Sequence, residues 1–301
     1  MFLLFSDNHQ VYLKSPIEPK HFRQNISSMG SYYQIFSPEI HRRLFALEGL
    51  DADYALLDIP PEELASRADT LRELAAFNVT IPHKRAVIPL LDSLGDAARL
   101  FGAVNAVHNA DGRLVGDNTD CGGFLRALGA HGVAIAGDIC VLGAGGVGRM
   151  FALECARQGA RVTVAVRESG REKASELLRE AREKLGAELS VRGIDALDGR
   201  FSLLINGTPV GMYPNTDACP VPPALLDGVD TVFDCVYNPS ETLLLRHARE
   251  RGVKAVGGME MLVWQAAIAH EIWHGTRFSD RAVGRIVEEM AAYLLLKEQT
   301  P

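Results

Sequence analysis

The glycine-rich segment "GAGGVG", residues 143–148, constrains the fold more than any other feature of the chain. It follows the apolar run "ICVL" and precedes "RMFALECARQG", whose apolar residues recur at helical spacing. Gly143, Gly145 and Gly148 allow a sharp turn after a strand, bare backbone at the turn and close packing of the helix. A strand, a G-x-G-x-x-G turn and a helix predict that a dinucleotide pyrophosphate binds at the helix N-terminus.

Strands and helices alternate from residue 138 onward. The segments, in order, are "DICVL", a helix, "RVTVAV", the helix "REKASELLREAREKL", "FSLLING" and "TVFDCVY". Such alternation predicts parallel strands with crossover helices, as in a Rossmann-like domain. Residues 31–120 alternate similarly, with helices near "SPEIHRRLFALEGL" and "PEELASRADTLRELA" and strands at "ADYALLDI" and "AFNVTIP". We therefore expect an α/β protein of two α/β domains.

Two apolar helical stretches follow Gly258, "MLVWQAAIAHEIWHG" and "RAVGRIVEEMAAYLLLKEQ". We expect them to pack back on the first domain. The predicted division is residues 1–120 with 259–301 as one domain and residues 121–258 as the dinucleotide-binding domain. In the first part of the chain, "KSPIEPKHF" and "NISSMGSYY" are expected to be loops.

Composition and charge exclude several function classes. The formal net charge of −7 argues against nucleic acid and anionic membrane as partners and leaves a small-molecule substrate. No apolar segment reaches the ~18 residues of a membrane helix, and the N-terminus lacks the basic flank of a signal peptide, so a cytoplasmic protein is expected. The five cysteines have no C-x-x-C spacing, which predicts reduced thiols and no metal site, with Cys121 as a small buried side chain.

The choice of dinucleotide depends on the end of the strand "RVTVAV". An NAD enzyme usually places an Asp or Glu there, whereas this chain has Val166 followed by Arg167 and Arg171. A guanidinium that binds a 2′-phosphate favours NADP, while Glu168 leaves NAD open as the alternative. The predicted cofactor-binding residues of the loop and the strand end are Gly143, Ala144, Gly145, Gly146, Val147, Arg167 and Arg171.

Three polar clusters stand at the ends of apolar runs: "NVTIPHK", "GAVNAV" and "GDNTD". The carboxyl ends of strands form the ligand crevice of α/β folds, so these clusters are expected to meet there. Lys84 and Asp120 can form a proton-transfer pair for oxidation of a secondary alcohol, and the amides and hydroxyls around them suit a polyhydroxylated substrate. His83, the neighbour of Lys84 on an alternating strand end, is expected to face the other way and is left out.

With these motifs in hand, the chain resembles the shikimate dehydrogenase family, including its quinate-using relatives. The matching segments are "SPEIH", "NVTIPHK", "GAVNAV", "GDNTD", "GAGGVG", "INGTPVGMYP", "DCVYNPSETLLLRHARERG" and "GMEMLVWQAAIAHEIWHG". They run in the family's order from Ser37 to Gly275. The resemblance implies a two-domain enzyme with its active site in the cleft, which reduces 3-dehydroshikimate to shikimate with NADPH in aromatic amino-acid (chorismate) biosynthesis.

The resemblance also implies residue roles. Lys84 would transfer the proton, and Asp120 would be its partner. The remaining positions are Thr80, Asn105 and Gln265 at the ring hydroxyls, Ser37 and Tyr237 at the carboxylate end, Cys235 and Gly258 as backbone contacts near the nicotinamide, and Arg167 at the phosphate.

One departure from the family's pattern concerns the substrate. The family's loop usually reads Ser-x-Ser-Pro, and Ile35 stands at the first serine in "GSYYQIFSPEIH". A lost hydrogen bond to a charged group costs about 1.5–3 kcal/mol. Quinate or another shikimate analogue is therefore the alternative substrate, unless the hydroxyl of Tyr32 or Tyr33 replaces that of the missing serine. A non-catalytic dinucleotide-binding regulator would have lost Lys84 or Asp120, and both are present. A monomer and a homodimer both remain open.

Overall fold

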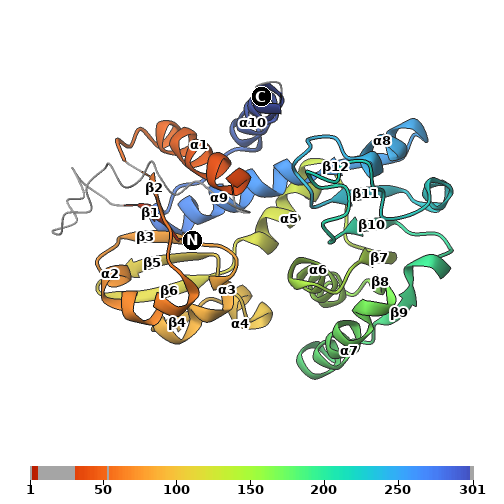
Figure 1. Cartoon of the computed structure of the whole chain (residues 1–301), viewed down its shortest axis with the longest axis horizontal. Helices are drawn as coiled ribbons and strands as arrows, with labels where there is room; N and C mark the ends of the chain where they lie inside the picture. Colours follow the sequence, from red (N-terminus) through yellow and green to blue (C-terminus); the bar gives the residue numbers. More distant parts are fainter. Residues whose placement is uncertain (1, 6–30, 53, 299–301) are drawn as a thin grey trace. The chain divides into compact units, whose positions relative to one another are not determined.

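A computed structural model describes residues 2–5, 31–52 and 54–298 of the chain (Figure 1). It contains two compact units, each with its own six-stranded sheet. The first unit is Met1–Thr119 with Ala266–Ser279, and the second is Asp120–Gln265 with Asp280–Pro301. In the described residues, no helix is long and apolar enough to cross a membrane.

The sheet of the first unit is mixed, in the order β2-β1-β3-β5-β6-β4. Its strands are β1 (Phe2–Phe5), β2 (Tyr54–Leu57), β3 (Ala76–Val79), β4 (Ser93–Leu94), β5 (Ala106–Ala110) and β6 (Arg113–Asp117). β1 lies antiparallel between β2 and β3, β3 and β5 are antiparallel, and only β4 and β6 are parallel. The strands at "ADYALLDI" and "AFNVTIP" are confirmed, whereas the sequence placed no strand at residues 2–5.

The turn between β5 and β6 explains why these strands are antiparallel. Asp111 and Gly112 have φ angles of 52° and 86°, and the Asn109 Oδ1 accepts a hydrogen bond from the Gly112 N–H at 2.7 Å. Two residues with positive φ form a turn whose twist matches that of a hairpin. The Asp-Gly pair is the signal for this hairpin in the sequence, and the strand–helix alternation did not include it.

Four helices and three short helical turns of the described residues lie before or between the strands of this sheet. They are α1 (Ser31–Glu48), α2 (Ala68–Arg72), α3 (His83–Ala86) and α4 (Asp96–Phe101), with short turns η2 (Pro61–Glu63), η3 (Ala65–Arg67) and η4 (Ile88–Leu90). The loop expected at "NISSMGSYY" is wrong for residues 31–33, which begin α1. No residue between Gly30 and Pro38 is a helix breaker. Residues 25–30 of that segment, and the segment "KSPIEPKHF", lie outside the described residues. Apolar side chains including Phe77, Leu71 and Leu114 form the core.

The second unit has an entirely parallel sheet, in the order β12-β11-β10-β7-β8-β9. Its strands are β7 (Asp138–Leu142), β8 (Arg161–Val166), β9 (Ser190–Gly193), β10 (Leu203–Asn206), β11 (Thr231–Asp234) and β12 (Lys254–Gly257). The strand order reverses between β7 and β10, which is where open α/β sheets bind ligands. The predicted Rossmann-like alternation is confirmed, and the glycine loop leaves β7 at this switch point.

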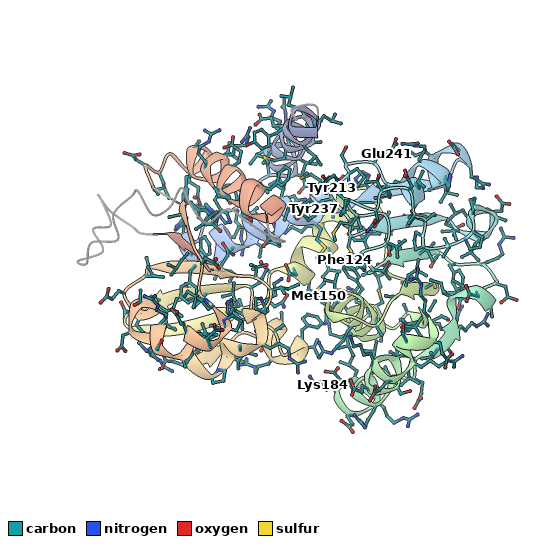
Figure 2. The ribbon with its side chains drawn as sticks, in the orientation of Figure 1. Phe124, Met150, Lys184, Tyr213, Tyr237 and Glu241 are labelled. Carbon is teal, nitrogen blue, oxygen red and sulfur yellow. The ribbon has the colours of Figure 1, made fainter. Side chains whose placement is uncertain are left out.

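Six helices and three short turns belong to this part of the chain. They are α5 (Asp120–Ala130), α6 (Gly146–Arg157), α7 (Arg171–Leu185), α8 (Leu243–Glu250), α9 (Gly258–His274) and α10 (Asp280–Glu298), with η5 (Glu168–Gly170), η6 (Ile194–Ala196) and η7 (Pro223–Gly228). Phe124, Phe151 and Phe233 pack α5 and α6 against β11, with ring centroids 4.5 to 5.6 Å apart. Phe124 is labelled in Figure 2. One of these pairs is tilted and two are edge-to-face, and such aromatic pairs contribute to stability beyond their buried area.

The contacts divide the chain somewhat differently from the predicted domain boundaries. The break at 119/120 lies beside the predicted one, but α9 contributes to both units and α10 groups with the second. Apolar periodicity shows that a helix has a buried face without showing which neighbour covers it. The assignment of substrate binding to one part and dinucleotide binding to the other stays a prediction.

Backbone conformation and close packing account for two glycines of the segment 143–148. Gly143 has φ 91°, in the region that favours glycine. A Cβ on Gly148 would overlap the carbonyl oxygen of Gly143, and a Cβ on Gly207 would lie 2.7 Å from the Gly148 Cα. The start of α6 therefore sits directly on the loops that follow β7 and β10.

Gly148→Ala should lower the free energy of unfolding by about 1–3 kcal/mol, because the added methyl group forces backbone apart. Gly146→Ala is the matched control, since a Cβ there meets no atom within 4 Å. Urea unfolding of both variants measures the difference. Equal midpoints for the two variants would show that the contact at Gly148 does not constrain α6.

A buried carboxylate holds the loops after β10 and β11. Asp234 is fully buried and accepts hydrogen bonds from the Thr242 Oγ1 at 2.6 Å, the Asn206 Nδ2 at 2.9 Å and the Val236 N–H at 3.0 Å. Burial raises the pKa of Asp234 to about 6, although these hydrogen bonds act in the opposite direction. The proton is therefore retained in the folded protein well above the pH at which an exposed Asp loses it.

The stability of the protein should fall between pH 4 and pH 7 because of this group. Unfolded Asp234 ionises near the ordinary aspartate pKa of 3.8, while the folded protein keeps the proton up to about pH 6. In this interval the unfolded state binds fewer protons, so wild type should lose about 3 kcal/mol relative to Asp234→Asn. Denaturant unfolding of both proteins across this range measures the difference. Parallel stability curves would contradict the raised pKa.

Candidate functional site

The lysine predicted to transfer the proton lies just after β3 in the first unit. β3 ends at Val79, half-buried Thr80 follows, and half-buried Lys84 lies in α3. The carbonyl of Lys84 accepts a hydrogen bond from the Val104 N–H at 2.7 Å, which fixes α3 beside the segment leading into β5. Thr80 and Lys84 are thus placed at one end of this sheet.

Asn105 is held rigidly in the same unit. Its side chain is 3% exposed, its Nδ2 donates to the Thr119 Oγ1 at 2.9 Å, and its Oδ1 accepts from the Thr119 N–H at 2.7 Å. Its carbonyl accepts from the Asn78 Nδ2 at 3.1 Å, and the Asn78 Oδ1 accepts from the Tyr54 hydroxyl at 3.0 Å. These hydrogen bonds fix the positions of the Asn105 amide oxygen and amide nitrogen. A side chain that orients a substrate needs such a fixed amide.

The reason that the sequence suggested for leaving His83 out of the candidate site does not hold in the structure. The strand does not reach His83, so strand alternation does not apply; His83 and Lys84 lie in the helical turn α3. The His83 ring is buried and its Nε2 lies 2.8 Å from the carbonyl oxygen of Ile59. Burial lowers the pKa of His83, so the ring is neutral near pH 7.

In the second unit, predicted site residues meet where β11 and β12 end. Gly258 begins α9, its N–H donates to the Val236 carbonyl at 3.3 Å, and a Cβ on it would overlap the carbonyl oxygen of Cys235. The Cys235 N–H donates to the Asn206 carbonyl at 3.1 Å. Cys235 and Gly258 are therefore adjacent, and half-buried Tyr237 follows on the same loop.

Asp120 and Gln265 lie on α5 and α9 of this unit and are 8% and 7% exposed. The helices approach closely, since a Cβ on Gly123 would lie 2.7 Å from the Met261 carbonyl oxygen. The Gln265 Nε2 donates to the Leu262 carbonyl at 2.9 Å.

The loop predicted to bind the dinucleotide has the geometry that this role requires. α6 begins at Gly146 with Gly145 as its N-cap, and a Cβ at either position would meet no atom within 4 Å. Internal packing among the described residues therefore does not explain these two glycines, whereas close approach of a phosphate to bare backbone does. The N–H groups of the first helical turn are the natural partners of that phosphate.

Two of the charged residues after β8 are hydrogen-bonded to each other. β8 ends at buried Val166, and Arg167 is the exposed residue that follows. The Arg171 Nε donates to the Glu168 Oε2 at 2.6 Å, and both side chains are largely exposed. Glu168, the candidate ribose acid, is thus paired with Arg171, while Arg167 stands nearest the strand end.

The thiols do not resemble nucleophiles. Burial raises the pKa of Cys121 and of Cys235 far above the usual range of a thiol. Cys121 is 4% exposed, which confirms it as a buried small side chain.

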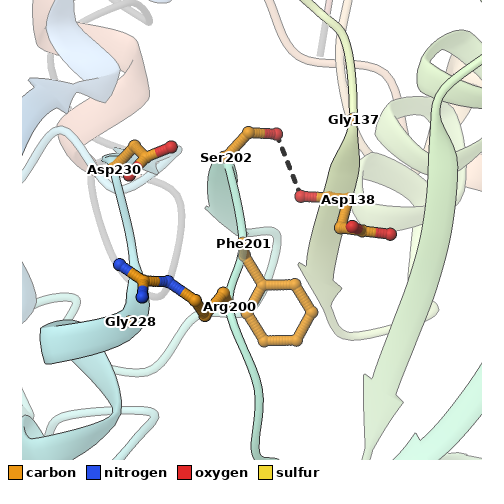
Figure 3. A pocket seen from close by; sticks show the side chains of 7 residues that line it. All are labelled: Gly137, Asp138, Arg200, Phe201, Ser202, Gly228 and Asp230. Atoms are coloured by element: carbon orange, nitrogen blue, oxygen red, sulfur yellow. Dashed lines mark hydrogen bonds between the residues drawn. The ribbon is translucent and has the colours of Figure 1, made fainter.

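A surface pocket of the second unit lies away from the glycine loop. Asp138, Phe201 and Ser202 line it, at the amino ends of β7 and β10, and the Ser202 Oγ donates to the Asp138 carbonyl at 3.0 Å (Figure 3). The glycine loop follows the carboxyl end of β7, so it lies at the opposite end of the strands. This pocket is therefore not the predicted dinucleotide site.

Each unit contains its own share of the predicted site. Ser37, Thr80, Lys84 and Asn105 lie in the first unit. Asp120, Cys235, Tyr237, Gly258, Gln265, Arg167, Arg171 and the glycine loop lie in the second. The pairing of Lys84 with Asp120 and the placement of the site in a cleft stay predictions.

Sequence reasoning missed two groups of buried polar residues. One is Asp234 with Asn206 and Thr242, inside the quoted segments "INGTPVGMYP" and "DCVYNPSETLLLRHARERG". A polar residue ending each of two apolar strands was the available signal. The other group joins Glu48 to two histidines of α9, His270 and His274.

Comparisons with known proteins identify the family of the chain. The family model "Shikimate dehydrogenase substrate binding domain" matches residues 33–107. "Shikimate dehydrogenase (NADP(+))" of Symbiobacterium thermophilum is 42% identical over 251 residues, covering 80% of this chain and 85% of the relative.

Two solved structures extend the comparison to three dimensions. Shikimate 5-dehydrogenase from Thermus thermophilus, in complex with NADP(H) and shikimate, has a TM-score of 0.76 and 33% identity, covering 86% of this chain and 96% of that chain. The ligand-free 5-ketofructose reductase of a Gluconobacter strain has a TM-score of 0.73 and 32% identity, covering 84% and 93%. With relatives of this identity and coverage, the chain belongs to the shikimate dehydrogenase family.

Proposed function

We propose that the chain catalyses the reversible, NADP-dependent reduction of 3-dehydroshikimate to shikimate. The observation that carries the proposal is the 42% identity to a shikimate dehydrogenase over 85% of that relative's length. The glycine loop after β7 and the polar residues after β3 supply the two chemical requirements, a dinucleotide site and a proton-transfer residue.

NADP is the proposed cofactor. Bound at the start of α6, it would exchange a hydride at nicotinamide C4 with the substrate carbon. Gly145 and Gly146 would present backbone N–H groups to the pyrophosphate, and Arg167 would bind the 2′-phosphate. The hydrogen bond between Glu168 and Arg171 supports NADP, because it draws the acidic side chain nearest the strand end away from a ribose.

Lys84 and Asp120 are the proposed proton-transfer pair. When shikimate is oxidised, the reacting hydroxyl would give its proton to the Lys84 Nζ as the C–H hydride leaves and the C=O bond forms. In the reverse direction the Lys84 ammonium would return the proton to the ketone oxygen. Asp120 would hold the ammonium in position.

The remaining polar residues are proposed to orient the substrate. Thr80, Asn105 and Gln265 would bind ring hydroxyls, and Ser37 with Tyr237 would lie at the carboxylate. The fixed amide of Asn105 supports its part, since its hydrogen bonds to Thr119 leave little freedom to reorient.

Substrate identity depends on more than the fold. A 5-ketofructose reductase shares this fold at 32% identity, so the architecture accommodates more than one polyhydroxylated ketone. Quinate or another shikimate analogue, prompted by Ile35, remains the second candidate, and a non-catalytic regulator the third. The cytoplasmic location and the choice between monomer and homodimer stay predictions.

Lys84→Ala should reduce kcat with shikimate and NADP⁺ by about 10²–10⁴-fold and leave the NADP⁺ dissociation constant within about twofold, because only the proton-transfer group is lost. Arg85→Ala, the exposed neighbour in α3, is the matched control and should keep wild-type rates. Initial rates and fluorescence titration with NADPH measure the two quantities.

Wild type is assayed in the same experiment with shikimate and quinate in the presence of NADP⁺, and with 5-ketofructose in the presence of NADPH as the reductant. A higher kcat/KM for quinate or 5-ketofructose would replace the proposed substrate. Tight NADP⁺ binding without turnover of any of the three would favour the regulator. Undiminished turnover by Lys84→Ala would remove that residue from the mechanism.

Arg167→Ala should raise the KM for NADP⁺ at least about tenfold and leave the KM for NAD⁺ nearly unchanged, since only NADP⁺ carries the 2′-phosphate. Arg161→Ala is the control, because Arg161 begins the same strand and pairs with Asp138. An equal rise in both Michaelis constants would refute the assignment of Arg167 to the phosphate.

A further inference from the structure

A cluster of two histidines and one carboxylate lies in the first unit, apart from the predicted catalytic residues. His270 and His274 are one turn apart on α9, and Glu48 is the last residue of α1. The His270 Nδ1 lies 2.7 Å from the Glu48 Oε2, and the His274 Nδ1 lies 3.0 Å from the Glu48 Oε1. One potential ligand atom from each residue lies within 4.8 Å of the others.

The cluster is shielded from solvent. The side chains of His270, Glu48 and His274 are 0%, 3% and 9% exposed. Phe45 packs on the His270 ring with centroids 4.6 Å apart. Burying a carboxylate is costly unless a positive charge compensates it.

No Lys or Arg of the described residues compensates Glu48. Its hydrogen-bond partners there are the two histidines and the Thr276 hydroxyl, which donates to the Glu48 Oε1 at 2.8 Å. With neutral imidazoles the cluster has one negative charge. Either an added proton or a bound cation can balance it.

The donor set suits a transition metal better than Ca²⁺ or Mg²⁺. Two imidazole nitrogens and a carboxylate are typical ligands of Zn²⁺, whereas the harder cations take oxygen ligands. Metal bonds of about 2.0–2.1 Å in tetrahedral geometry would separate ligand atoms by about 3.3 Å. The Glu48 oxygens, now 2.7 and 3.0 Å from the histidine nitrogens, would move outward by about half an ångström. The two histidine side chains, whose ligand atoms lie within 4.8 Å of each other, would adjust to the same separation.

The neighbours of the ligands are placed as a metal site requires. The His270 Nε2 lies 2.8 Å from the His41 Nδ1. When the His270 Nδ1 binds a metal, its Nε2 keeps the proton and donates it to the His41 Nδ1. Thr276 orients Glu48 from the other side. Such outer hydrogen bonds typically fix the orientation of metal ligands.

The segment "HEIWH" also matches the H-E-x-x-H pattern of zinc proteases, in which the Glu is a general base. Here the Glu271 side chain is 2% exposed, accepts from the Arg277 Nη1 at 2.9 Å and accepts from the Phe278 N–H at 3.2 Å. A carboxylate held in this way is not available to activate water. The pattern therefore does not indicate hydrolysis.

We propose that Glu48, His270 and His274 form a structural site for one divalent metal ion of the zinc class. The ion ties the end of α1 to the last turn of α9, which lie side by side (Figure 1). Water occupies the fourth position of the tetrahedron.

The full chain, freed of metal by a chelator, is titrated with Co²⁺ and then with Zn²⁺. We expect one Co²⁺ per chain with the visible absorption bands of tetrahedral coordination, displacement by Zn²⁺, and a higher Tm with Zn²⁺ but not with Mg²⁺. Wild type that binds no stoichiometric Co²⁺ or Zn²⁺ overturns the proposal and leaves a proton as the balancing charge.

Variants assign the ion to these residues. Glu48→Gln and His274→Gln should weaken Zn²⁺ binding at least about 100-fold, and His41→Phe about 10–100-fold. His131→Gln is the control, because its Nε2 lies 2.5 Å from the Glu260 Oε1 at a more exposed site, and it should bind as wild type does. Equal affinity in wild type, Glu48→Gln and His274→Gln would place the ion elsewhere and overturn the assignment; the wild-type Co²⁺ spectrum tests the site even if a variant fails to fold.

Discussion

The packing of α6 on the loops after β7 and β10 is the constraint on which the second unit depends. Gly148 lies so close to the Gly143 carbonyl and to Gly207 that no side chain fits between them. This contact directs the helix N-terminus toward the point where the strand order reverses. The N–H groups and the dipole of the helix then face the place where a dinucleotide phosphate binds in such sheets.

Buried polar side chains fix the segments that leave the strands. Asn105 holds Thr119 in the first unit, and Asp234 holds Asn206 and Thr242 in the second. In each case a polar atom out of contact with water needs a partner, and the loop conformation of the structure provides it. Hydrogen bonds therefore help to order the loops that carry candidate site residues.

The sequence predicted the elements whose pattern is local. The strand 161–166 and the helix 171–185 form as expected, because alternation of apolar residues and helical spacing are visible within a few residues. It did not predict β1, which lies between β2 and β3. The position of a strand in a sheet depends on partners far along the chain, and a run of four residues carries no mark of them.

The same distinction, between local sequence patterns and contacts of distant residues, applies to the candidate site. The sequence by itself determined the glycine loop, the polar clusters that include Lys84 and Asp120, and membership of the shikimate dehydrogenase family, since these are properties of short motifs and their order. Only the tertiary structure decided which polar side chains form hydrogen bonds with one another. Glu48 and His270 are 222 residues apart, and they meet because α1 and the end of α9 pack in one unit. A contact of that kind depends on the path of the whole chain, which no local pattern encodes.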